Sequence, residues 1–265
     1  MPRRVRGPQR DRSPAIRSAR SCSCEAKPTA TAPLTEAILR QRLEQVWKEI
    51  REAEDKSGRP AGSVHLLPVT KGHPAETAEL ATMVGLTRLG ENYVQECQEK
   101  DRFLRATGAP AVSWHLLGHL QRNKVARAAQ LFQSVASVDS LELARKLSAA
   151  RSGQPPLPVL CEVELTGLPN RTGFQPAQLQ EAMPQLVELA GIAVDGLMTV
   201  AAPHTPRATF SACRKLAEGM RELSGLALST LSMGMTGDFQ AAIAEGSTEV
   251  RIGTLLFGDR QAPRH

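Results

Sequence analysis

The strongest constraint on the fold of this chain is a regular alternation of short apolar runs and helix-like segments between residues 64 and 256. Buried parallel strands are typically short apolar runs, and the helices that connect them are amphipathic. The apolar runs span residues 64–70, 87–89, 113–117, 134–138, 157–165, 192–200, 226–232 and 250–256. The helix-like segments span residues 75–84, 93–106, 123–131, 141–150, 176–190, 206–223 and 239–245. Eight such strands favour closure, so the sequence predicts an α/β protein with a single (β/α)8 TIM barrel.

Two segments precede the barrel pattern. Residues 36–53 place Leu39, Leu43, Val46 and Ile50 at helical spacing with charged residues between them, which predicts an extra N-terminal helix. Residues 1–31 are rich in Arg, Ser and Pro and have no strand or helix periodicity, so we expect a disordered basic tail there. An Arg-rich leader is also typical of a transit peptide. We therefore divide the chain into a tail, residues 1–31, and a barrel, residues 32–265.

The charge distribution argues against a nucleic-acid partner. The chain has a net charge of +6, but residues 1–31 hold eight of the 33 basic and two of the 27 acidic residues. The remainder is formally neutral, with 25 of each. Aromatic residues make up only 3% of the chain, too few for base-stacking platforms. No apolar run is long enough to span a bilayer, so no membrane partner is expected.

The cysteines indicate a reducing compartment. The chain has five, an odd number spread over its length, which is not the pattern of a disulfide framework. We expect a cytoplasmic protein. The pair Cys22 and Cys24 has no second ligand pair nearby, so no metal site is expected.

A lysine follows the first predicted strand. The run VHLLPVT ends at Thr70 and is followed by Lys71, at the end of the strand where barrels place their chemistry. Partial burial at a barrel mouth lowers the pKa of an amine and frees it to attack a carbonyl carbon. The alternative is a solvated lysine that only ends the strand.

The C-terminal segment supplies a second kind of site. Residues 231–260, LSMGMTGDFQAAIAEGSTEVRIGTLLFGDR, contain two turns rich in Gly, Ser and Thr, each at the end of a predicted strand. Such turns offer free backbone N–H groups that bind phosphate, and barrels often build phosphate sites after strands seven and eight. An amine together with a phosphate anchor suits a phosphorylated aldehyde such as pyridoxal phosphate.

Several motifs occur in the order of a known family. They are VTK ending at Lys71, GENYVQE at 90–96, WHLLGHLQRNK at 114–124, SVDS at 137–140, GLMTV at 196–200, SMGMTGD at 232–238 and VRIG at 250–253. On these motifs the chain resembles the pyridoxal phosphate homeostasis proteins, whose barrels are related to the N-terminal domain of alanine racemase. The resemblance covers roughly residues 36–260.

The resemblance implies a set of residues that bind pyridoxal 5'-phosphate. Lys71 would hold the cofactor as an aldimine, Arg251 would face the pyridine nitrogen, and Asn92 would contact the cofactor. Three residues are implied as phosphate donors: Ser232, Gly253 and Thr254. A structural ion-pair role for Arg251 and a turn-forming role for Asn92 are the alternatives.

The resemblance also bears on catalysis. A racemase needs two bases on opposite sides of the cofactor ring, and alanine racemases take the second, a tyrosine, from a further domain of a partner subunit. This chain ends seven residues after Gly258, and its one tyrosine, Tyr93, lies early in the barrel. An arginine at the pyridine nitrogen disfavours the protonated ring that acts as an electron sink.

We therefore expect a non-catalytic monomer that binds pyridoxal phosphate. It would act in intracellular homeostasis and supply of the cofactor, with transient contacts to apo enzymes that use it. The alternatives are a weak amino-acid racemase and an aldolase that forms a Schiff base through its lysine.

Overall fold

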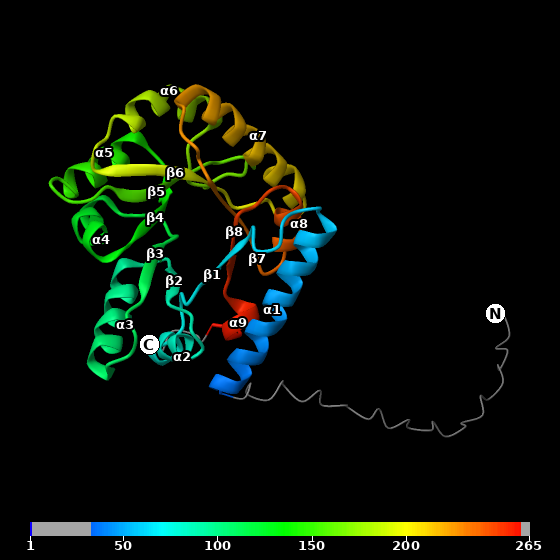
Figure 1. Ribbon diagram of the computed structural model, residues 1–265. Helices are drawn as coiled ribbons and strands as arrows, with labels where there is room; N and C mark the ends of the chain where they lie inside the picture. Colours follow the sequence, from blue (N-terminus) through cyan, green and yellow to red (C-terminus); the bar gives the residue numbers. More distant parts are fainter. Residues whose placement is uncertain (2–32, 261–265) are drawn as a thin grey trace, which may run out of the picture. The chain divides into compact units, whose positions relative to one another are not determined.

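Eight parallel strands form the centre of the molecule in the computed structural model, which describes Met1 and residues 33–260 (Figure 1). The strands are β1 (His65–Pro68), β2 (Arg88–Glu91), β3 (Ser113–Leu116), β4 (Ser134–Val138), β5 (Leu157–Glu162), β6 (Ile192–Met198), β7 (Thr230–Met235) and β8 (Glu249–Ile252). Their order is β1-β8-β7-β6-β5-β4-β3-β2. A single parallel bridge, between Val69 and Gly90, joins β1 to β2 and closes the ring. The predicted TIM barrel is therefore confirmed.

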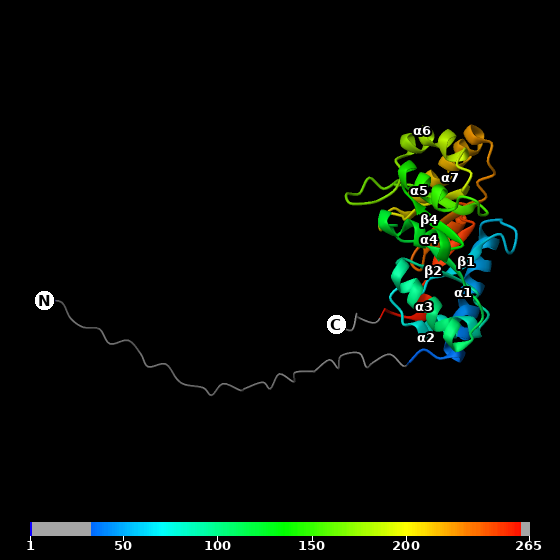
Figure 2. The ribbon, with the colours of Figure 1, turned by 90° about the vertical axis from the view of Figure 1, so that its left-hand side faces the viewer.

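Helices surround the ring, as the two views in Figures 1 and 2 show. They are α1 (Glu36–Lys56), α2 (Ala75–Met83), α3 (Val94–Thr107), the 3-10 turn η1 (Arg122–Lys124), α4 (Val125–Leu131), α5 (Leu141–Ala150), α6 (Pro176–Val187), α7 (Pro206–Ser224), α8 (Phe239–Ala244) and α9 (Thr254–Phe257). Within the part of the chain that the structure describes, none of them has the length and apolar character needed to cross a membrane.

The predicted N-terminal helix is α1. The hydroxyl of Thr35 accepts a hydrogen bond from the backbone N–H of Ile38 and so begins the helix. Leu39, Val46 and Ile50 are buried, because helical spacing places them on one face. The helix packs against α8 and α9, close to the end of the barrel sequence.

The barrel interior carries charge as well as apolar side chains. Side chains alternate between the two faces of a strand, so Val250 and Ile252 of β8 pack in the apolar layer beneath the helices. Glu249 and Arg251 then point into the ring, where they are 7% and 6% exposed. A small apolar cluster, separate from the main hydrophobic core, consists of Ala136, Leu160 and Met198.

The last two predicted strands have different bounds in the structure. β7 begins at Thr230 instead of residue 226, although Leu228 is buried, because the chain takes a positive φ of 39° at Leu228. β8 ends at Ile252, and residues 254–257 form α9, which buries Leu256 and Phe257. A short apolar run is equally compatible with a buried strand and a buried helical turn. The predicted disordered tail, with Cys22 and Cys24, lies outside the described residues, and the division at residue 31 stays a prediction.

Candidate functional site

One cavity lies at the carboxyl ends of the strands and has a volume of about 350 Å³. Five of the six residues predicted for the site line it: Lys71, Asn92, Arg251, Gly253 and Thr254. They come from the ends of β1, β2 and β8, which are neighbours because the ring closes there. Pairing of β1 with β8 therefore brings the two ends of the barrel sequence to one site.

Lys71 places its amine in a cationic environment. The side chain is partly buried, and burial lowers its pKa below the ordinary value for lysine. The guanidinium groups of Arg260 and Arg251 lower this pKa further, whereas the carboxylates of Glu91 and Glu96 raise it. No hydrogen bond or ion pair of the Lys71 side chain is found among the described residues. The amine is thus available to react with a carbonyl compound in the cavity.

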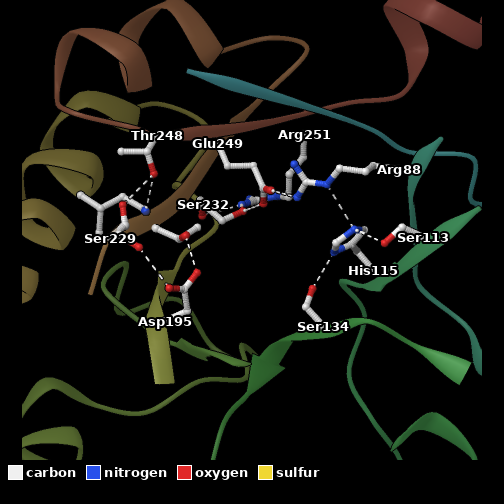
Figure 3. A network of polar contacts seen from close by, with 12 residues as sticks. Arg88, Ser113, His115, Ser134, Asp195, Ser229, Ser232, Thr248, Glu249 and Arg251 are labelled. Carbon is white, nitrogen blue, oxygen red and sulfur yellow. Dashed lines mark hydrogen bonds and ion pairs between the residues drawn. The ribbon is translucent and has the colours of Figure 1, made fainter. Parts of the chain in front are cut away.

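A buried hydrogen-bond network holds Arg251 (Figure 3). Its Nη1 donates to the backbone oxygen of Ser232 at 2.5 Å and to the Ser232 hydroxyl at 2.9 Å, and its Nη2 donates to the backbone oxygen of Thr199 at 2.9 Å. The Ser232 hydroxyl in turn donates to Glu249 at 2.9 Å. Glu249 also forms an ion pair of 3.2 Å with Arg88. These contacts fix the guanidinium at the wall of the cavity.

Ser232 is the predicted site residue that the structure does not bring to the cavity. Its side chain is fully buried, and its hydroxyl contacts Glu249 and Arg251 instead of the cavity. Thr236, four residues later, lies in the turn after β7 and lines the cavity together with Gly237. Thr236 was not predicted from the sequence, although its hydroxyl lies inside the glycine-rich MGMTGD turn.

The turns after β7 and β8 face the cavity with free backbone donors. Within the described residues, no hydrogen-bond acceptor is found for the N–H groups of Thr236 and Gly253. A Cβ atom at Gly253 would lie 3.1 Å from the backbone oxygen of Val69, so the absence of a side chain permits this close approach to β1. Unpaired N–H groups beside a cationic cavity suit an anion such as phosphate.

Three further cavity residues were also missed. They are Glu162 at the end of β5, His73 beyond Lys71, and Arg260. Burial raises the pKa of Glu162, and burial lowers the pKa of His73. Glu162 could have been predicted as a site residue, because it lies at the carboxyl end of a strand.

Asn92 lines the cavity and also carries a polar atom without a partner among the described residues. Its Oδ1 is buried and has no hydrogen-bond partner within the described part of the chain. A buried acceptor without a partner carries a free-energy cost that a bound donor would remove.

The network of Figure 3 continues from Arg88 to His115, neither of which lines the cavity. Arg88 Nε donates to His115 Nε2 at 3.3 Å, and His115 Nδ1 lies 2.6 Å from the hydroxyl of Ser134. His115 as a whole is 8% exposed. Burial, followed by the charge of Arg88, lowers the pKa of His115 to about 4. His115 is therefore neutral near pH 7.

The fold and the cavity define a class of protein: a barrel in which a partly buried lysine shares one cavity with glycine-rich turns that carry unpaired N–H groups. Comparison with known proteins agrees with this class. A family model described as "Alanine racemase, N-terminal domain" matches residues 38–261. The pyridoxal phosphate homeostasis protein of Vibrio cholerae is 39% identical over 234 residues, covering 86% of this chain and 98% of the relative. That of Escherichia coli K12 is 36% identical and covers 82% and 95%.

A solved structure gives the same result. PipY of Synechococcus elongatus PCC7942, solved with PLP bound, is 36% identical to this chain and superposes with a TM-score of 0.73. The alignment covers 83% of this chain and 100% of PipY. The chain belongs to the pyridoxal phosphate homeostasis protein family, within the group that shares the alanine racemase N-terminal domain.

The depressed pKa of His115 makes a prediction about stability. Between pH 6.5 and about 4 the unfolded chain binds a proton at His115 that the folded chain does not, so the free energy of unfolding falls as the pH is lowered. A His115→Gln variant should lose less stability than the wild type between pH 7 and pH 4.5, by about 2–3 kcal/mol. Urea denaturation at the two pH values measures this difference. The control is His65→Gln, at an exposed position, and equal losses in wild type and His115→Gln would contradict the prediction.

Proposed function

We propose that this protein binds pyridoxal 5'-phosphate through an aldimine with Lys71 and serves the homeostasis and supply of the cofactor. The observation that carries the proposal is one amine of lowered pKa in a cationic cavity that is also lined by turns with unpaired N–H groups. The cavity volume of about 350 Å³ falls within the range of roughly 300–1,000 Å³ typical of small-molecule sites. The bound PLP in the related PipY supports the same ligand.

The proposed binding mode uses the residues around the cavity. The aldehyde reacts with Lys71, and the phosphate lies against Gly253, Thr254 and Thr236. Arg251 faces the pyridine nitrogen, where its fixed positive charge disfavours a proton on the ring. The Asn92 side chain contacts the ring substituents. When bound, the cofactor would supply an electrophilic carbon, and the protein would supply orientation and charge.

A carrier role is favoured over turnover by the composition of the cavity wall. A racemase needs a second base opposite the lysine. Tyr93 is 63% exposed and does not line the cavity, and Lys71 is the sole lysine among the described lining residues. Glu162 and His73 are titratable groups in the wall. Because a titratable group in the wall can act as a base, racemisation is measured together with the aldimine.

Purified protein with pyridoxal phosphate should absorb in the visible range through its aldimine. Lys71→Ala should lose this band, because no other amine lines the cavity within the described residues. Lys215→Ala, which removes an exposed lysine on α7, is the matched control and should keep it. A band that persists unchanged in Lys71→Ala would disprove the aldimine. Interconversion of alanine enantiomers by the wild type would favour the racemase, and a colourless wild type would favour the aldolase.

The phosphate contacts can be tested with a cofactor that lacks them. Thr236→Val should raise the Kd for pyridoxal phosphate by about 10- to 100-fold, since a hydrogen bond to a charged group contributes about 1.5–3 kcal/mol. The Kd for pyridoxal, which has no phosphate, should not change. Fluorescence titration measures both constants. An equal loss for the two ligands, or no loss for either, would show that Thr236 does not bind the phosphate.

The supply role predicts transfer of the cofactor. Loaded protein, freed of unbound cofactor by gel filtration, should restore activity to an apo enzyme that uses pyridoxal phosphate. Protein reduced with borohydride, in which the bond to Lys71 is irreversible, is the control and should restore none. If the loaded protein retains all of its cofactor in the presence of the apo enzyme, the supply role fails while the binding proposal stands.

A further inference from the structure

The backbone on both sides of Lys71 is held by side chains from α3. Lys100 Nζ donates to the backbone oxygen of Thr70 at 2.7 Å, on one side. The backbone N–H of Gly72 donates to Glu96 Oε1 at 2.6 Å, on the other side. Lys71 itself makes neither contact. Its position is therefore set through its two neighbours.

The side chains that make these contacts also contact one another. Lys100 Nζ lies 2.5 Å from Glu91 Oε1 and 2.7 Å from Glu96 Oε1. The hydroxyl of Thr70 donates to the same Glu91 oxygen at 2.7 Å. We call Thr70, Glu91, Glu96 and Lys100 the Lys71 clamp. Each contact is made in or beside the protein interior, since Thr70, Glu91 and Lys100 are 0%, 0% and 2% exposed.

The clamp spans the joint between β1 and β2, which has the fewest paired residues of any two neighbouring strands in the barrel. Thr70 follows β1, whereas Glu91 ends β2, and one bridge between Val69 and Gly90 joins these two strands. Elsewhere in the ring, neighbouring strands pair over two or more residues. At this joint the side-chain contacts of Lys100 take the place of further ladder hydrogen bonds.

The clamp also acts on Lys71 through charge. It holds one ammonium and two carboxylates, and Glu91 and Glu96 both raise the pKa of Lys71 against the effects of burial, Arg260 and Arg251. Gly72 has a φ of 70°, so the chain turns sharply directly after Lys71. A shift of the Gly72 N–H away from Glu96 would therefore redirect the chain at the residue that carries the amine.

We propose that Lys100 and Glu96 are positioning residues for Lys71, which fix where its amine enters the cavity by holding the backbone of Thr70 and Gly72. The inference rests on the proposed function of Lys71 and concerns residues that do not line the cavity. Glu91 keeps the Lys100 ammonium in place as its buried counter-ion. Without the clamp, Lys71 remains in the chain, but its amine is no longer held at the reacting position.

The first test removes the Lys100 contact without changing the net charge. The double variant Lys100→Met with Glu91→Gln loses one positive and one negative charge. Apo protein is mixed with pyridoxal phosphate, and the visible band is followed over time and pH; borohydride trapping and mass spectrometry identify the labelled lysine. The plateau rate is the rate at which the band forms at high pH, where it no longer depends on pH. This rate should fall by about 10- to 100-fold, because displacing a reacting group by about 1 Å has effects of this size. Arg105→Met, at an exposed position of the same helix α3, is the control and should react as the wild type does.

The second test uses the partly exposed Glu96, whose side chain is 23% exposed, so that folding is less at risk. Glu96→Gln keeps an oxygen that accepts from Gly72 but removes the charge, so the pH midpoint of the reaction should shift downward while the plateau rate stays near that of the wild type. Glu96→Ala removes charge and acceptor together, and its plateau rate should also fall. Exchange of the Gly72 amide hydrogen should be faster in Glu96→Ala than in Glu96→Gln.

The outcomes separate this inference from the function on which it rests. If wild-type protein is not labelled at Lys71, the proposed function fails. If wild type is labelled but the folded double variant reacts at the wild-type rate, the positioning role is overturned. If the double variant does not fold, equal plateau rates for Glu96→Gln and Glu96→Ala overturn it instead.

Discussion

The pairing of the first strand with the last is the constraint on which the site depends. β1 and β8 pair in parallel from His65 with Glu249 to Pro68 with Ile252, so the residues that follow these strands emerge side by side. Lys71 and Gly253 lie 182 positions apart in the sequence and yet line one cavity. Parallel pairing also directs every carboxyl end to the same face of the ring. An open sheet with β1 and β8 at opposite edges could not form this cavity.

The two cationic side chains Arg251 and Lys71 line the same cavity but differ in their partners. Arg251 is held by backbone oxygens and by Ser232, and Glu249 balances it from within the interior. Lys71 has no such partner among the described residues. Buried charges are stable in proteins when they are paired and hydrogen-bonded. The protein thus keeps Arg251 fixed as a permanent cation and leaves the Lys71 amine free to change its protonation state, which is what a reversible bond to an aldehyde requires.

Much of this arrangement could be predicted from the sequence, and the reasons for the exceptions are physical. The alternation of apolar runs predicted the barrel, and position after a strand predicted Lys71. The family resemblance implied Asn92, Arg251, Gly253 and Thr254, and all five residues line one cavity. The resemblance also implied Ser232 as a phosphate donor. The strand, however, continues to Met235, and the Ser232 hydroxyl is buried against Arg251 and Glu249. The contacts of Lys100 could not be predicted, because a lysine on an amphipathic helix is normally exposed and no local pattern marks a buried ion pair.

The single bridge between β1 and β2 has a consequence for how the ring behaves as a whole. Backbone pairing is extensive between β5 and β6 but consists of one bridge at this joint, so this part of the ring depends on side-chain contacts instead. Lys71 and Asn92 follow the two strands that meet at the joint. A substitution among the side chains that make these contacts would therefore loosen the barrel first at the strand ends that carry Lys71 and Asn92.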